Sequence, residues 1–225
     1  MSAGARGVGA LGAAPSEPIV LGENSAGLAL DLVTRHADRF LGWTALPLLA
    51  GIADGTLTRP DFAGYLEQDY LYIQHFGRFF TELAAGADDA HIGFLVTLAA
   101  GVYGVEQERQ LELEQRFGAD FGAAVPTTAT RDYVALLRST AGDLGLALAA
   151  TLPCMYGYRV AARATHVPED SPYAEWVALY RGDEYLEMVG RHAALLDSLA
   201  PDPARAEEAF LAALDCEDAF WSLAR

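Results

Sequence analysis

Two acidic residues, Asp69 and Glu217, each fall within the apolar stripe of a different predicted helix. A carboxylate that faces a protein core loses its water, which is unfavourable unless a partner binds it. One such acid on its own is more often half of a structural ion pair than part of a site. Two of them on separate helices are harder to explain in that way, so they are candidates for acid–base chemistry.

A third candidate, Cys154, directly follows Pro153 inside a long apolar segment. Proline removes a backbone hydrogen bond from a helix, so we expect a kink beside this thiol. Tyr158 follows one turn later on the same face, and Tyr133 and Tyr180 come from neighbouring predicted helices. Tyrosines are suited to gripping a planar heteroaromatic ligand, although ordinary packing is an open alternative, and a lone buried cysteine is more often inert.

Other kinds of chemistry find little support in the sequence. No Glu-x-x-His pair or HExxH motif occurs, and we interpret His36 as a core residue rather than a haem ligand, so no metal or cofactor is predicted. The chain also lacks a GxSxG elbow and a phosphate-binding loop set between a strand and a helix. Its formal net charge of −16 argues against binding to nucleic acid.

The helix that must position Asp69 is predicted from Thr58 to Ala87. Thr58 can cap it, and Pro60 suits its first turn. Its apolar positions follow helical spacing and leave Asp69 in the middle of one stripe; they are Phe62, Tyr65, Leu66, Tyr72, Ile73, Phe76, Phe80 and Leu83.

The rest of the chain also predicts helices. Caps and stripes indicate helices over residues 25–40, from Asp88 or Asp89 to Gly118, from Thr127, from Asp143 through Pro153, over 172–182, over 183–201, and from Asp202 to the end, with a short irregular or helical piece over 46–53. No stretch alternates with a period of two. We therefore predict an all-α bundle of six to eight helices in a single domain.

Residues 1–24 are expected to form a flexible tail without a signal peptide, and residues 25–225 the helical domain. No apolar run is long and pure enough to cross a membrane, so we predict no membrane partner. The two cysteines, Cys154 and Cys216, form no CxxC pattern, which favours a reducing cytoplasm.

Four blocks of the sequence resemble the TenA family, also called thiaminase II or aminopyrimidine aminohydrolase. They are GTLTRPDFAGYLEQDYLYIQHFGRF, LPCMYGY, SPYAEWVALYRGDEY and the terminal EDAFW, and their order and spacing agree over about residues 40 to 222. The resemblance implies a haem-oxygenase-like helical bundle that forms homotetramers and needs no metal or haem.

The resemblance also implies roles for single residues. Asp69 matches the pyrimidine-binding aspartate, Cys154 in LPC the nucleophile of the cysteine-containing subset, and Glu217 the catalytic glutamate. The tyrosines of the same pocket match Tyr72, Tyr133, Tyr158 and Tyr180, of which Tyr133 aligns only across a gap of about two residues. The chain departs from the family pattern at Leu46–Pro47–Leu48, where His-Pro-Phe is usual, and at Gln110, where histidine is usual.

The implied reaction converts 4-amino-5-aminomethyl-2-methylpyrimidine to hydroxymethylpyrimidine in thiamine salvage, and some members also cleave thiamine. In this chemistry the Cys154 thiolate adds to an electron-poor ring carbon, and Glu217 gives a proton to the ring and later takes one from water. Asp69 fixes the orientation of the ring. A non-catalytic regulatory or protein-interaction module is the alternative, and an oxidase on the same bundle is a third hypothesis that the missing Glu-x-x-His pairs disfavour.

Overall fold

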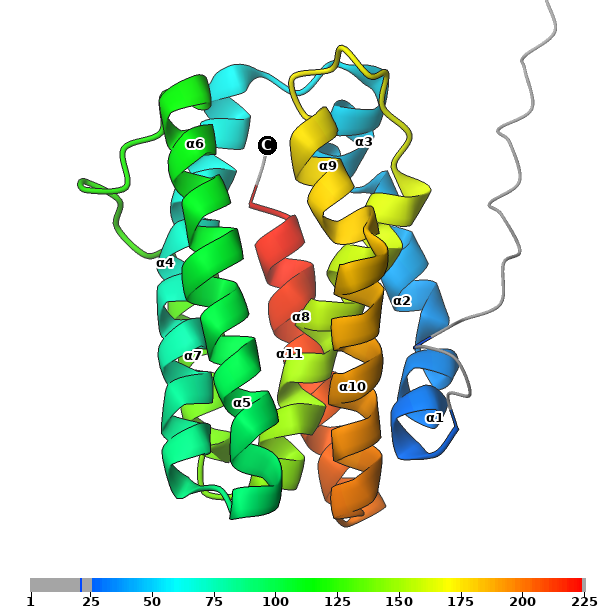
Figure 1. The fold of residues 1–225 in the computed structure, drawn as a ribbon. Coiled ribbons are helices and arrows are strands. Elements are labelled where there is room, and N and C mark those ends of the chain that lie inside the picture. The colour runs from blue at the N-terminus through cyan, green and yellow to red at the C-terminus, as the bar shows by residue number, and fades with distance from the viewer. Residues whose placement is uncertain (1–20, 22–25, 224–225) are drawn as a thin grey trace, which may run out of the picture.

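The structure is a computed structural model that describes Leu21 and residues 26–223. It is one bundle of roughly upright helices, with the last helix running up its middle (Figure 1). Within the described residues the chain forms eleven α-helices and no strand. This confirms the predicted all-α, single-domain bundle, whereas the predicted number of helices is too low.

The α-helices are α1 (Leu28–Arg35), α2 (Ala37–Gly42), α3 (Pro47–Asp54), α4 (Arg59–Gly86), α5 (Asp89–Gly101), α6 (Gln107–Phe117), α7 (Thr128–Thr140), α8 (Leu144–Ala164), α9 (Ala174–Arg181), α10 (Asp183–Leu199) and α11 (Pro203–Trp221). A 3₁₀ turn, η1 (Trp43–Ala45), precedes α3, and a π-helical turn, η2 (Val102–Glu106), joins α5 to α6.

Helix α4 begins and ends where its sequence signals predict. The Thr58 hydroxyl accepts a hydrogen bond from the backbone N–H of Asp61, and Pro60 occupies the first turn. The predicted stripe is buried along the whole helix, including Asp69, which is 1% exposed. The sequence therefore determines this helix locally, and the helix carries Asp69 into the core.

The first predicted helix, residues 25–40, is wrong as a single element. His36 leaves the helical region with φ −113° and ψ 19°, so α1 ends at Arg35 and α2 begins at Ala37. Both Arg35 and His36 contact Glu207 of α11, His36 Nε2 at 3.3 Å from its carboxylate oxygen. An apolar stripe that continues across one residue does not reveal such a break, because the pattern on either side stays in phase.

The single helix predicted after Asp88 is present as two α-helices that are joined without a loop by a π-helical turn. Helices α5 and α6 run end to end along α4 and are joined by η2 (Figure 1), and α6 ends at Gly118, whose φ of 76° suits glycine. A π-turn bonds each residue to the fifth before it, so it adds one residue to the turn. This shifts the face that α6 presents relative to a continuous α-helix.

Helix α8 is buried along nearly all of its length and packs against α10 and α11. It continues through Pro153, and the Asp143 side chain caps it by accepting from the N–H of Leu146. Cys154 and Tyr158, one turn apart, therefore both lie in the interior of the bundle.

No helix in the described part of the chain has both the length and the apolar character needed to span a membrane. The predicted tail, residues 1–24, lies outside the described residues apart from Leu21, which packs in the core.

We predict that Gly157→Ala destabilises the bundle. A methyl group at this position would collide with the Trp43 indole, so the free energy of unfolding should fall by about 1–3 kcal/mol, as for overpacked cores. Urea unfolding followed by circular dichroism measures the change. Gly64→Ala on α4 is the control: it meets no atom within 4 Å, and it should raise stability by up to about 1 kcal/mol. Equal effects of the two variants would contradict the packing argument.

Candidate active site

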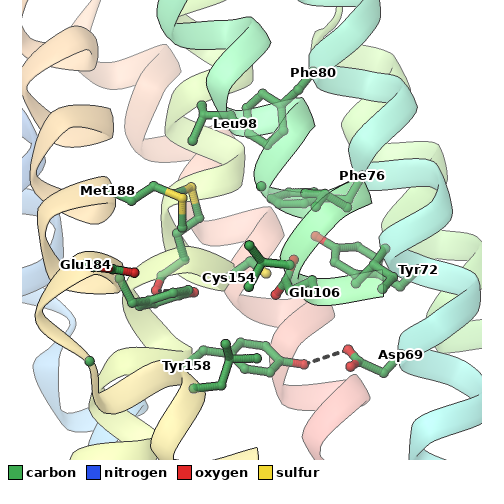
Figure 2. A pocket seen from close by; sticks show the side chains of 18 of the residues that line it. Asp69, Tyr72, Phe76, Phe80, Leu98, Glu106, Cys154, Tyr158, Glu184 and Met188 are labelled. Atoms are coloured by element: carbon green, nitrogen blue, oxygen red, sulfur yellow. Dashed lines mark hydrogen bonds between the residues drawn. The ribbon is translucent and has the colours of Figure 1, made fainter. Parts of the chain in front are cut away.

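A cavity of about 510 Å³ lies between α4, α5, η2, α8 and the α9–α10 segment (Figure 2). Of the residues predicted from the sequence, Asp69, Tyr72, Cys154 and Tyr158 line it. Glu217, Tyr133 and Tyr180 are buried beside it but are not part of its lining. The helices therefore bring all seven residues into one region, in two layers around the cavity.

Asp69 is held by hydrogen bonds at both of its carboxylate oxygens. The Tyr158 hydroxyl donates to Oδ1 at 2.9 Å, and the Gln110 side-chain amide donates to Oδ2. Burial raises the pKa of Asp69 to about 7, although both hydrogen bonds lower it. The departure at Gln110 has a clear structural role, since a neutral amide orients the carboxyl without adding a positive charge.

Glu217 lies next to Cys154, with which it interacts directly, although it is not part of the cavity lining. Its Oε1 accepts a hydrogen bond of 2.7 Å from the Tyr133 hydroxyl, while Oε2 has no hydrogen bond of normal geometry within the described residues. Burial raises the pKa of this carboxyl to about 7, whereas Tyr133, Trp221 and the Cys154 thiol favour its charged form. A carboxyl with a free oxygen beside a thiol can exchange a proton with it.

Cys154 is a buried, free thiol on the cavity wall. Burial raises its pKa well above the usual value, and the neighbouring charges of Glu217 and Glu106 raise it further. Tyr72 opposes this shift. The resting group is therefore a protonated thiol, and it can act as a nucleophile only if a neighbouring base removes its proton during attack.

Glu106 is a fourth reactive group that the sequence interpretation did not assign to the site. It is the last residue of η2 and lines the cavity together with Asp69 and Cys154. Burial and the charge of Asp69 raise its pKa to about 8, while the hydrogen bond from the Tyr180 hydroxyl, 3.3 Å long, lowers it. The sequence did carry a signal, since helical spacing places this acid four residues after Val102, on the same face of the segment. The structure adds that Glu106 lies in a π-turn, a feature that is frequent at functional sites.

Three of the four predicted tyrosines share one task. Tyr158 donates to Asp69, Tyr133 to Glu217 and Tyr180 to Glu106. Their rings also pack in the walls: that of Tyr158 lies 4.7 Å from that of Tyr180, and that of Tyr133 lies 4.6 Å from that of Tyr72. Each of the three acids therefore has its own hydroxyl donor.

The cavity lining is acidic. It includes four carboxyl residues, Asp69, Glu106, Asp183 and Glu184, and no arginine or histidine. Such a lining favours a cationic ligand and repels a phosphate ester. Among the described residues, no group of three or more His, Cys, Asp or Glu side chains is placed to hold a metal ion.

We predict that Glu106→Gln flattens the pH dependence of stability. The pKa of Glu106 is about 8 in the folded protein and about 4.5 in an unfolded chain, so the folded state binds more protons between these values. The free energy of unfolding of the wild type therefore falls as pH rises through this window. The variant lacks this contribution, and its stability should fall less between pH 5 and pH 8.

Urea unfolding at the two pH values tests this prediction. Glu184→Gln is the matched control, because Glu184 lines the same cavity but is exposed. A slope for Glu106→Gln that matches the wild type would show that Glu106 does not hold a proton in the folded state.

Comparison with known proteins connects this geometry to a group of relatives. A model of the TENA/THI-4/PQQC family matches residues 46–225 of the chain. The aminopyrimidine aminohydrolase of Halalkalibacterium halodurans is 29% identical over 193 residues, which cover 79% of this chain and 86% of that protein. The aminopyrimidine aminohydrolase of Bacillus subtilis is also 29% identical, over 79% of this chain and 81% of that protein.

A solved TenA homologue from Pyrococcus furiosus has the same fold. It superimposes with a TM-score of 0.81 at 24% sequence identity and covers 88% of this chain and 100% of its own. The predicted haem-oxygenase-like bundle is thereby confirmed, because TenA structures have that fold.

Proposed function

The chain belongs to the TENA/THI-4/PQQC family, and from that premise we propose that it hydrolyses 4-amino-5-aminomethyl-2-methylpyrimidine to the hydroxymethylpyrimidine of thiamine salvage. The relatives named aminopyrimidine aminohydrolase match it over most of their length. One observation carries the proposal: Cys154, Asp69 and Glu106 line a single acidic cavity, and Glu217 lies next to the thiol.

The first step forms a bond between Cys154 and the ring. Because the thiol is protonated at rest, Glu217 takes its proton as the sulfur adds to an electron-poor ring carbon. The pKa of Glu217 is about 7, so this carboxyl can accept the proton and then pass it to the ring nitrogen beside the attacked carbon. The ring thus gains the sulfur without accumulating negative charge.

Asp69 and Glu106 act on the two polar ends of the substrate. Asp69, fixed by Tyr158 and Gln110, accepts hydrogen bonds from the ring amino group and sets the orientation of the ring. Glu106 pairs with the exocyclic nitrogen and gives it a proton as the carbon–nitrogen bond breaks. Water then adds to the exocyclic carbon and returns a proton to Glu106. As the carbon–sulfur bond breaks, Glu217 takes the proton back from the ring nitrogen and returns it to the Cys154 sulfur, which restores both the ring and the thiol.

The alternative, a non-catalytic regulatory or protein-interaction module, makes a different prediction for the same cavity. Such a module needs no nucleophile, and its cavity residues could be exchanged without loss of a chemical product. The Glu217 carboxyl lies next to the Cys154 thiol and can accept its proton, which favours the enzyme. The rate of ammonia release separates the two functions.

We predict that Cys154→Ala and Glu217→Gln each lower ammonia release from the aminomethylpyrimidine by roughly 100-fold or more, because one loses the nucleophile and the other its base. A coupled ammonia assay with chromatographic detection of the product measures the rates. Cys216→Ala is the matched control: this half-buried thiol precedes Glu217, and its removal should leave the rate near that of the wild type. Undiminished release by Cys154→Ala would reject the mechanism, and no release by the wild type would favour the non-catalytic module.

We also propose that the protein forms homotetramers in the cytoplasm. Cys154 and Cys216 are both free, in keeping with a reducing compartment. An exposed apolar face on α5 and η2 supports association of copies, because large side chains there reach 40% exposure at Ile92, 52% at Val96 and 61% at Val105. A second copy of the chain is the occupant to which we commit for this face.

We predict that the double variant Ile92→Glu, Val96→Glu has a lower mass in solution than the wild type, because charges would have to be buried between copies. Sedimentation velocity measures the mass. Val125→Glu is the control, since Val125 is 74% exposed in the loop between α6 and α7. A monomeric wild type, or a double variant of unchanged mass, would contradict an interface on this face.

A further inference from the structure

The cavity extends well beyond the space that a single pyrimidine ring occupies, and we propose that its far end binds an apolar group carried on the exocyclic amine nitrogen of the substrate. The substrate class is then N-alkyl or N-aryl aminomethylpyrimidines, which release an apolar primary amine. This inference rests on the proposed function and specifies the leaving group.

Helix α4 gives the cavity its length and its polarity. Asp69, Tyr72, Phe76 and Phe80 all line it and follow each other at intervals of three or four residues along one face of the helix. At a rise of about 1.5 Å per residue, Asp69 and Phe80 lie about 16 Å apart along the helix. The wall changes over this distance from a hydrogen-bonded carboxyl to phenyl rings.

The facing wall has the same polarity because α5 packs against α4 after a tight connection and runs in the opposite direction. Glu106 therefore lies near Asp69, and the charge of Asp69 raises the pKa of Glu106. Leu98 lies at the same end of the cavity as Phe80. Figure 2 shows Asp69 and Tyr158 at one end and Phe80 and Leu98 at the other.

The reacting groups lie at the boundary between the two ends. In Figure 2, Cys154 and Glu106 lie between the Asp69–Tyr158 end and the Phe80–Leu98 end. With the ring at the Asp69 end, the exocyclic nitrogen reaches this boundary beside Glu106. A substituent on that nitrogen can then extend away from the ring toward Phe76 and Phe80, and an apolar substituent favours this direction over the one toward the exposed carboxyl of Glu184.

The far end accepts apolar groups only. Its main walls are Phe76, Phe80, Leu98, Val102 and Met188, of which the first four are 5% exposed or less. None of these side chains can donate or accept a strong hydrogen bond, so a hydroxyl or charge placed here would lose its water without replacement. Burying alkyl or aryl surface there is favourable.

Gly101 keeps this compartment open. It lines the cavity inside a helix, where glycine is less favourable than alanine, and a Cβ built on it would meet only the Met188 sulfur, at 3.9 Å. A larger side chain at position 101 would therefore occupy the compartment without a backbone clash. This makes Gly101 the position at which the proposal can be tested.

The reaction balances without any further reactant. The carbon–nitrogen bond of R–NH–CH₂–pyrimidine breaks with its electron pair going to nitrogen, and a carbon–oxygen bond forms to water. One water proton ends on the nitrogen, which gives R–NH₂ and the hydroxymethylpyrimidine. No oxidant or reductant takes part.

The test compares the parent aminomethylpyrimidine with its N-butyl derivative. Calorimetry on the Cys154→Ala variant measures affinity without turnover, and product chromatography on the wild type measures kcat/KM. We expect the N-butyl ligand to bind at least 10-fold more tightly, since each buried methylene contributes roughly threefold. Equal or weaker binding of the N-butyl ligand overturns the proposal.

Gly101→Leu, added to the same background, should remove the preference for the N-butyl ligand while the affinity for the parent changes by less than about threefold. Gly93→Leu is the matched control on the same helix, because position 93 is exposed and open, and it should keep the preference. An equal loss of affinity for both ligands in Gly101→Leu overturns the proposal. A preference for the N-butyl ligand that Gly101→Leu abolishes, in a wild type that hydrolyses neither compound, supports the compartment and rejects the proposed function alone.

Discussion

The site depends on one electrostatic constraint: three carboxyls and a thiol lie close together, all of them buried except the half-buried Glu106, and no positively charged side chain lines the cavity. Removing a carboxylate from water without a counter-ion favours the neutral acid, which is why the pKa values of Asp69, Glu106 and Glu217 reach about 7 to 8. Groups with such pKa values can both give and take protons near neutral pH. A cation in this cluster would abolish that property.

Tyrosine hydroxyls donate hydrogen bonds to these carboxyls, as arginine side chains often do in other proteins, but they add no positive charge. Each of the three acids accepts a hydrogen bond from the hydroxyl of its own tyrosine. The Tyr158 hydroxyl is also hydrogen-bonded to the Tyr65 hydroxyl, at 2.9 Å. A hydroxyl orients a carboxyl and partly stabilises its ionised form, yet leaves the acid able to hold a proton. The rings of these tyrosines are held by aromatic neighbours: Trp176 packs against both Tyr158 and Tyr180. The ring of Tyr133 packs against that of Tyr72.

Local signals made much of this arrangement predictable. The Thr58 cap, Pro60 and one apolar stripe defined α4, and a carboxyl inside that stripe identified Asp69 as buried, as the same logic did for Glu217. Glu106 was missed as a site residue although it also falls on an apolar face, because its place at the cavity depends on η2, and a π-turn is not detected by a stripe analysis at 3.6 residues per turn. The break at His36 depends on contacts with Glu207, far along the sequence, which no local pattern contains.

The length of the cavity separates the groups that carry out the reaction from the residues that select the substituent of the substrate. Asp69 lies at the polar end of the cavity and Glu106 near its middle, and the apolar end lies at Phe80, about three turns of α4 from Asp69. Over that distance, replacing one apolar side chain by another adds no charge and breaks no hydrogen bond of the cluster, so the pKa values of the acids stay as burial sets them. The shape of the apolar end can therefore vary while the chemistry is retained, because the two ends of the cavity share the same helices but not the same interactions.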